Sequence, residues 1–151
     1  MNEVTDFRVY GGVVKGSYQD LRVWKQAMEL AKAVYRVTES FPKHEFFGIT
    51  NQMRRAAVSV PSNIAEGKGH RSDKEFERFL LHARGSVLEL ETQMLLAGEL
   101  GFAEKEDVGE ITMKTAEVAR GLNALMNSFH REFTTGHGES QSNIRKPRAN
   151  D

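Results

Sequence analysis

The stretch SDKEFERFLLHARGSVLELETQMLLAGELG, residues 72–101, carries the signals of one complete helix. Ser72 and Glu75 have the spacing of a capping box, in which each side chain satisfies a backbone N–H group near the other residue. An apolar stripe then recurs every three or four residues, which keeps it on one side of a helix. Its members are Phe76, Leu80, Ala83, Val87, Leu90, Met94 and Ala97. Gly101 follows as the expected C-terminal glycine, so the pattern predicts a helix with one buried face.

Three further segments have the same helical spacing, and their apolar stripes are expected to form the rest of the core. The stripes are Leu21, Trp24, Met28, Ala31, Tyr35 and Thr38, then Ile49, Met53, Ala56, Val60 and Ile64, then Val108, Ile111, Thr115, Val118, Leu122, Leu125 and Phe129. Asp20 is expected to cap the first helix, and the aromatic residues Trp24, Tyr35, Phe76 and Phe79 are expected to pack in the core. Because short connections join consecutive helices, the sequence predicts an all-α, antiparallel up-down-up-down four-helix bundle over residues 18–133.

The two ends of the chain lack this pattern. Residues 1–17 are expected to form a flexible N-terminal arm, although a small hairpin at Gly11–Gly12 is the alternative. Residues 134–151 are polar apart from one Ile, so a disordered tail is expected. The chain has no cysteine, no apolar run of membrane-spanning length and no signal-peptide layout at its start. We therefore expect a cytoplasmic protein.

The helix over residues 72–101 carries a second apolar stripe, made by Leu81, Leu88 and Leu95. This stripe lies about 125° around the helix from the core stripe. Such a stripe is expected if this helix is the most buried helix of a monomer. It is also expected if the stripe forms an interface between subunits. Because monomers rarely leave such a continuous patch exposed, self-association is the favoured interpretation.

The sequence contains no signature of a metal site or of catalysis. None of its histidines has a glutamate three residues earlier, which argues against the Glu-x-x-His pairs of di-iron bundles. Metalloprotease, P-loop and nucleophile-elbow motifs are absent as well. Ser59 and Ser62 have no histidine nearby in sequence to act as a base, and His82, four residues before Ser86, is expected to be an ordinary, partly exposed residue. We expect no enzyme, no cofactor and no metal.

Charge is balanced overall but not locally. Residues 18–133 contain 16 Lys and Arg against 17 Asp and Glu, so the bundle as a whole lacks the field that attracts nucleic acid. A basic region is nevertheless formed by Arg54, Arg55, Lys68, Arg71, Lys74 and Arg78. Two interpretations stay open, namely a solvated helix end with ordinary ion pairs and a nucleic-acid-binding surface.

Polar residues form an ordered stripe beside the core of the second helix, within about 80° around its axis. They are Gln52, Arg55, Ser59, Asn63 and Glu66. Since burying an unpaired polar group costs about 1 to 3 kcal/mol, partners are expected on the next helix. Antiparallel packing would bring Gln52 and Arg55 level with Ser86 and Glu89, which predicts an interaction between Arg55 and Glu89. Pro61 is expected to bend the helix and to leave a polar notch.

Three segments resemble the bacterial 23S rRNA intervening-sequence proteins, a family of four-helix bundles. They are DLRVWKQAMELAKAVY at 20–35, FPKHEFFGITNQMRRAAVSVPSNIAEG at 41–67 and SDKEFERFLLHARGSVLELE at 72–91. The pattern Q-x-x-R-A-A-x-S-x-x-x-N-I-A-E-G is the most specific, and the resemblance covers about residues 18–130. It implies a ring-shaped homopentamer. Because the family is encoded within rRNA intervening sequences and a relative assists a reverse transcriptase, the resemblance also suggests binding of RNA or another nucleic acid.

The expected function is therefore that of a non-enzymatic oligomer that binds structured RNA or another nucleic acid through the basic region. The alternative is a protein-binding assembly scaffold, or an accessory subunit without direct contact to nucleic acid. In that alternative, the polar stripe would fix how neighbouring subunits align.

Overall fold

The computed structural model describes residues 16–135, with side chains described for residues 16–131. Four long helices are present: α1 (Arg22–Thr38), α2 (Ile49–Lys68), α3 (Asp73–Glu99) and α4 (Lys105–Thr135). Two short 3₁₀ helices, η1 (Tyr18–Asp20) and η2 (Lys43–Glu45), precede α1 and α2. Within residues 16–135 there is no strand, which confirms the all-α, four-helix prediction. Nearly all of the expected arm and tail, including Gly11–Gly12, lies outside the described residues.

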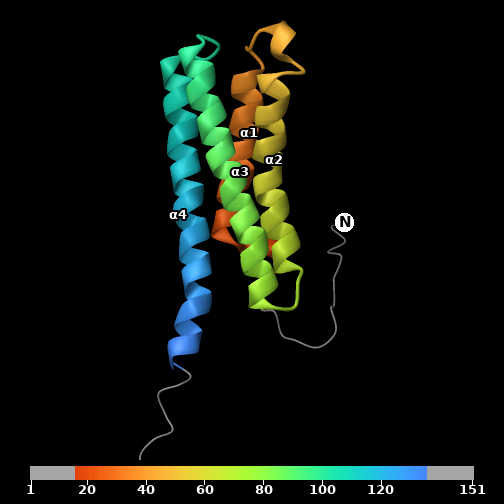
Figure 1. Cartoon of the computed structure of the whole chain (residues 1–151), viewed down its shortest axis with the longest axis vertical. Helices are drawn as coiled ribbons and strands as arrows, with labels where there is room; N and C mark the ends of the chain where they lie inside the picture. Colours follow the sequence, from red (N-terminus) through yellow and green to blue (C-terminus); the bar gives the residue numbers. More distant parts are fainter. Residues whose placement is uncertain (1–15, 136–151) are drawn as a thin grey trace, which may run out of the picture.

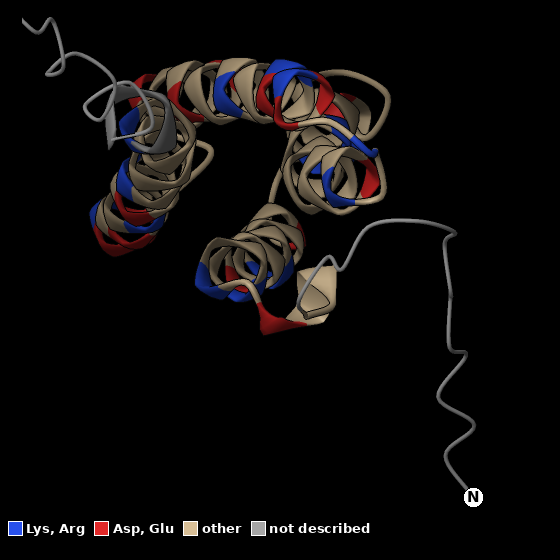
Figure 2. Cartoon of the chain, turned by 90° about the horizontal axis from the view of Figure 1, so that it is seen from below, with Lys and Arg blue, Asp and Glu red and all other residues tan. Residues whose placement is uncertain are grey.

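Each long helix packs against two others, and the four surround a common centre (Figure 2). α1 contacts α2 and α4, and α3 contacts the same two helices. The α1–α2 and α3–α4 connections lie at one end of the bundle, which we name the upper end (Figure 1). The α2–α3 turn lies at the opposite, lower end. The two connections at the upper end pack together, with the rings of Phe41 and Phe102 centred 6.2 Å apart.

The ends of α3 follow from the residues that flank it. At the start, the Ser72 hydroxyl accepts a hydrogen bond from the Glu75 N–H at 3.2 Å, so one half of the expected capping box forms. The Glu75 carboxylate bonds to Arg78 and does not form the other half. At the other end Gly101 adopts a φ of 75°, a left-handed conformation that glycine tolerates best. The Phe102 and Gly101 N–H groups then bond to the Ala97 and Gly98 carbonyls at 2.9 and 3.1 Å. This Schellman arrangement satisfies carbonyl groups that the end of the helix would otherwise leave free.

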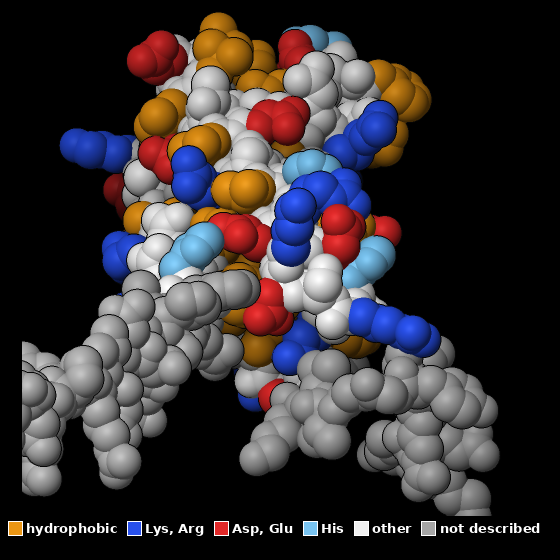
Figure 3. Space-filling model, turned by 60° about the horizontal axis from the view of Figure 1, so that its bottom comes forward, with side chains coloured by type: hydrophobic (Ala, Val, Ile, Leu, Met, Phe, Trp, Pro, Cys, Tyr) orange, Lys and Arg blue, Asp and Glu red, His pale blue; other side chains and the backbone are white. Residues whose placement is uncertain are grey.

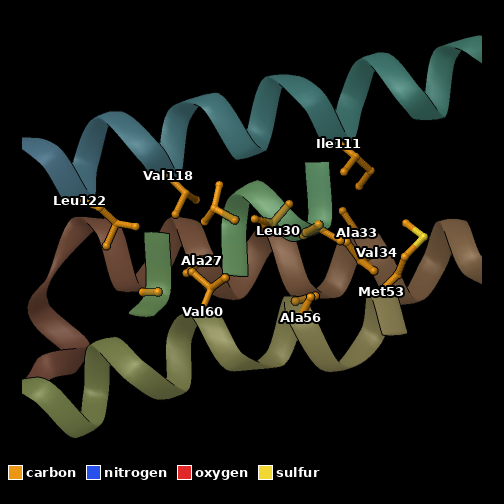
Figure 4. Close-up of a cluster of buried hydrophobic side chains, with 14 of the residues drawn as sticks. Ala27, Leu30, Ala33, Val34, Met53, Ala56, Val60, Ile111, Val118 and Leu122 are labelled. Atoms are coloured by element: carbon orange, nitrogen blue, oxygen red, sulfur yellow. The ribbon is translucent and has the colours of Figure 1, made fainter. Parts of the chain in front are cut away.

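Aliphatic side chains from all four helices meet in the core, and Figure 4 shows part of this cluster. Every residue of the expected α3 stripe is buried there. Leu30 of α1, Val60 of α2 and Leu122 of α4 are fully buried in the same cluster. Each such side chain stabilises the fold by about 1.5 to 3 kcal/mol relative to an exposed position.

The prediction of which residues of α1 face the core is wrong. The buried residues of this helix are Val23, Ala27, Leu30, Ala33, Val34, Val37 and Thr38, so only Thr38 of the expected set is buried. Met28 and Tyr35 are 37% and 46% exposed, and Trp24 is half-buried against the edge of Tyr18. Of the four aromatic residues assigned to the core, Phe76 and Phe79 are buried.

Close helix packing explains why the smaller residues of α1 face inward. Gly121 of α4 lies so near that a Cβ atom there would come within 2.9 Å of the Val23 Cγ2 atom. Bulky aromatic rings would hold the two helices further apart. Asp20 does not cap α1 either, because its carboxylate accepts from the Ser17 N–H at 2.9 Å and closes η1 instead. Leu21 occupies the capping position of α1 without a side-chain bond.

Candidate nucleic-acid interface and surrounding surfaces

The basic residues of the α2–α3 turn gather at the lower end. Arg71 and Lys74 are exposed and form no ion pair within the described residues. The Lys68 ammonium group, likewise without an ion pair there, lies 5.8 Å from the centre of the Phe76 ring. Arg78 pairs with Glu75 at 3.0 Å, so part of its charge is neutralised locally. Three unpaired cations therefore remain available at this end.

Histidines and an arginine cover the ring of Phe79 beside this turn. His70 stacks on the ring with centroids 4.8 Å apart, and the His82 ring meets it edge-on at 6.0 Å. The Arg78 guanidinium lies 4.8 Å from the ring centre. Figure 3 shows basic, histidine and acidic side chains intermixed around the lower end. The surface thus combines cations with acidic side chains and is not uniformly positive.

Arg54 and Arg55 do not join this lower surface. Arg54 and Lys68 are fourteen positions apart on one continuous helix, which is roughly 21 Å along its axis. The Arg54 Nε donates to the Thr38 Oγ1 at 2.8 Å, and its guanidinium lies over the Tyr35 ring at 4.8 Å. Arg55 is exposed and points to another side of α2. The six basic positions singled out from the sequence are therefore not one contiguous surface.

Polar side chains join α2 to α3, but in a different register from the expected one. Ser59 Oγ lies 2.5 Å from Ser86 Oγ. Gln93 Nε2 donates to Gln52 Oε1 at 3.4 Å and to Glu89 Oε1 at 3.2 Å. No bond joins Arg55 to Glu89 within the described residues, so that expectation is wrong for the single chain. Gln52 lies opposite Gln93, about one helical turn beyond Glu89 along α3.

Gln93 takes part in this polar contact between α2 and α3, although it was not predicted from the sequence. It is 9% exposed, and its Oε1 atom has no hydrogen-bond partner in the part of the chain that the structure describes. The sequence does contain a signal for this role. Gln93 follows Ser86 by seven residues, or two helical turns, so both residues lie on the same face of the helix. Glu66, the last residue of the expected stripe, is exposed.

α2 continues through Pro61, which is buried. The polar residues next to the proline bond to carbonyl groups of their own helix. Ser62 Oγ donates to the Val58 carbonyl and Asn63 Nδ2 to the Ser59 carbonyl, both at 2.8 Å. Such bonds supply the local partners that side-chain hydroxyl and amide groups need when they are partly buried. Ser62 and Asn63, the two polar side chains of the expected notch, thus bond within α2.

The leucine stripe of α3 is exposed. Leu81, Leu88 and Leu95 are 48%, 55% and 46% exposed. Leu81 follows Glu77 by one turn, and Glu77 bonds to His130 of α4 at 2.9 Å. The stripe therefore runs along the edge of α3 that faces α4.

A second exposed apolar surface lies on the other side of the bundle. Met28 and Tyr35 of α1 and Val58 of α2, which is 44% exposed, belong to it, together with Tyr18. We name it the α1/α2 apolar face. Because α1 does not pack against α3 and α2 does not pack against α4, the α1/α2 edge lies opposite the α3/α4 edge. The chain thus carries two apolar surfaces on opposite sides.

Little in the described residues supports catalysis. No cluster of metal-ligating residues is present among them, and none of their helices is long and apolar enough to cross a membrane. A cleft of about 600 Å³ lies between α1 and α4. Its one acidic residue, Glu117, accepts a hydrogen bond from Gln26 at 2.8 Å, and no histidine lines the cleft. An acid–base pair is therefore missing from this cleft.

Comparison with known proteins agrees with the four-helix architecture. The family model described as 23S rRNA-intervening sequence protein matches residues 19–124. A crystal structure of a protein of unknown function from the S23 ribosomal protein family of Bacteroides thetaiotaomicron superposes with a TM-score of 0.63 at 19% identity. That match covers 69% of this chain and 97% of the other, and at this identity it shows the fold alone. No curated protein matches. Since the family model covers most of the chain, this protein belongs to the 23S rRNA-intervening sequence protein family.

Proposed function

We propose that the protein is a non-enzymatic, cytoplasmic homo-oligomer that binds structured RNA or another nucleic acid through its lower end. The observation that carries the proposal is the set of unpaired cations at the α2–α3 turn, namely Lys68, Arg71 and Lys74. Membership of a family named for rRNA intervening sequences supports RNA as the first nucleic acid to test.

A neutral chain can still bind a polyanion if its cations are repeated in space. Phosphate contacts release counterions, and each contact adds to the affinity at low salt. Cyclic symmetry sets the same turn of every subunit at one height and one radius around the axis. A ring would therefore collect several copies of a three-charge surface, although one chain carries a formal net charge of zero.

We propose further that the up-down-up-down bundles assemble as a ring, with a pentamer as the expected size. Rings arise from heterologous contacts, in which two different surfaces of neighbouring subunits meet. The leucine stripe and the α1/α2 apolar face are two different surfaces of one chain, and a heterologous contact needs two such surfaces. Covering them would also remove two exposed apolar patches.

The RNA proposal is tested by measuring affinity for a structured RNA at several salt concentrations. The triple variant K68Q/R71Q/K74Q should bind more weakly and should reduce the slope of log K against log salt by up to about 0.9 per lost contact to duplex. The matched control R55Q/K105Q/R120Q removes three exposed charges from positions away from the turn and should keep the slope of the parent protein. Absence of binding at low salt, or equal weakening by both triple variants, would contradict the proposal.

The protein-scaffold alternative is favoured by one surface at the upper end. Phe47 is 88% exposed and its ring meets the Phe46 ring edge-on at 5.0 Å. Such a side chain suits an apolar pocket on another protein. An oligomer that forms normally but binds no RNA at low salt would favour this alternative.

A further inference from the structure

The upper end contains a small pocket of about 190 Å³ between the end of α1, η2 and the start of α2. Thr38, Lys43, Thr50 and Arg54 are among its lining residues. We propose that this pocket binds a small oxyanion of the size of phosphate. The proposal does not rest on RNA binding at the lower end, which lies at the opposite end of α2.

Thr50 supports a polar ligand here because its hydroxyl is buried without a partner. The residue is 4% exposed, and Oγ1 has no hydrogen-bond partner within the described residues. The other threonines with described side chains all donate to a carbonyl group of their own helix. They are Thr38, Thr92, Thr112 and Thr115. A buried hydroxyl that is left unpaired costs about 1 to 3 kcal/mol, so an acceptor in the adjoining pocket would be stabilising.

Arg54 supplies a fixed positive charge to the same pocket. Its Nε is held by the Thr38 hydroxyl at 2.8 Å, and Tyr35 lies beneath the guanidinium plane. The side chain is half-buried and forms no ion pair with a described carboxylate. Because the guanidinium is planar and rigidly placed, its remaining N–H groups suit two oxygens of one anion.

The start of α2 contributes a favourable electrostatic field. Gly48 has no side chain to cap this helix, and the Ile49 N–H donates to Glu45 Oε2 at 3.2 Å. The next two N–H groups, of Thr50 and Asn51, have no acceptor within the described residues. The Glu45 carboxylate already interacts with the positive end of this helix dipole, and the two unpaired N–H groups can still favour a second anion close by.

The charged side chains around the pocket are mixed in sign. Lys43 and Arg54 are the lining cations, and Glu39 is the lining acid. Lys43 and Glu39 are both exposed, so solvent screens both charges, whereas Arg54 is half-buried. The Glu45 carboxylate lies nearby and accepts the Ile49 N–H. An anion in the pocket would therefore be held mainly by Arg54 and by the hydroxyl of Thr50.

The test measures thermal unfolding while potassium phosphate replaces potassium chloride at constant ionic strength. The parent protein should gain melting temperature in a saturable manner, as expected for a ligand that binds only the folded state. Arg54→Gln should raise the apparent Kd for phosphate at least about tenfold. Arg55→Gln is the matched control, because it removes the neighbouring charge from a different side of α2 and should leave the Kd unchanged.

A second variant keeps the test valid if Arg54→Gln does not fold. Thr50→Val should raise the melting temperature in chloride, because it removes an unpaired hydroxyl, and should weaken the response to phosphate. A phosphate response that is equal in all four proteins, or that never saturates, would overturn the proposal, since phosphate also stabilises proteins without binding.

The source of the oxyanion is resolved by repeating the RNA assay with Arg54→Gln. Unchanged RNA affinity with a lost phosphate response assigns the pocket to a free small anion. Loss of both responses assigns it to a phosphate group of the nucleic acid. Loss of RNA affinity with an unchanged phosphate response would refute an oxyanion site at Arg54.

Discussion

The two ends of the bundle hold their cations in different ways. At the upper end, Arg54 is fixed by a hydroxyl and an aromatic ring within a small pocket. At the lower end, Arg71 and Lys74 extend from an exposed turn without an ion pair among the described residues. A rigidly held cation favours one small ligand of defined shape, whereas exposed cations favour an extended polyanion and a strong dependence on salt. Differences between variants at the two ends therefore separate these two kinds of recognition.

The largest effects on stability are expected from the aromatic residues that hold each end together. Phe41→Ala at the upper end and Phe76→Ala at the lower end should each lower the free energy of unfolding by about 3 to 5 kcal/mol. Both rings are 6% exposed, and they contact Phe102 and Phe129 respectively. Urea unfolding with a constant m value measures this loss. A loss below about 1 kcal/mol at either end would show that its ring is not part of the cooperative core.

A smaller effect is expected where α2 meets α3 at the lower end. A Cβ atom at Gly67 would lie 2.7 Å from the Phe79 Cβ and 2.8 Å from the Phe76 Cδ2. Gly67→Ala should therefore destabilise the protein by about 1 to 3 kcal/mol through overpacking. Gly85→Ala is the control, because nothing lies within 4 Å of its Cβ position and alanine favours a helix by about 1 kcal/mol. Equal stabilisation by both substitutions in urea unfolding would contradict the packing at Gly67.

The two threonines of the upper pocket should respond in opposite directions. Thr38→Val removes the acceptor of the Arg54 Nε and should cost about 1 kcal/mol. Thr50→Val removes a hydroxyl without a partner and should stabilise the anion-free protein by about 1 kcal/mol. Chloride solutions without phosphate are required for this urea-unfolding measurement. Destabilisation by both substitutions would indicate that the Thr50 hydroxyl has an acceptor in solution.

The smallest effect is expected from the ion pair that links α1 and α4. Arg36 Nη2 lies 2.6 Å from both carboxylate oxygens of Glu110, and the hydrogen bond and charge of Glu110 raise the pKa of Arg36. Arg36→Gln should lower the melting temperature slightly in dilute salt. The difference should vanish near 1 M salt, where the Debye length falls to about 3 Å. A difference that persists at high salt would show that the pair acts through packing instead.

Helix α3 shows where sequence patterns suffice, and α1 shows where they do not. Ser72, the apolar stripe and Gly101 all indicate the same helix, and every residue of the stripe is buried, although the polar residue Gln93 was not foreseen. α1 carries two stripes of comparable apolar character, and the choice between them depends on how closely α4 approaches at Gly121. That distance is a tertiary property that no local pattern contains.

The candidate sites were harder to predict than the helices for a related reason. Arg54 and Arg55 are neighbours in sequence, yet one lines a pocket and the other is exposed. The basic residues of the α2–α3 turn could be recognised from the sequence, because they are close together in the chain. The unpaired hydroxyl of Thr50 could not, since the lack of a partner depends on the positions of the surrounding atoms.

The two opposite apolar surfaces have a consequence for colloidal behaviour. Many proteins stay dispersed because their net charge makes molecules repel one another, but this chain has a formal net charge of zero and a pI near 7.0. Single chains would therefore meet one another with little repulsion while exposing Leu88 on one side and Tyr35 on the other. If the chain assembles as proposed, we expect its unassembled form to precipitate most readily, so solubility would depend on how quickly both surfaces are covered.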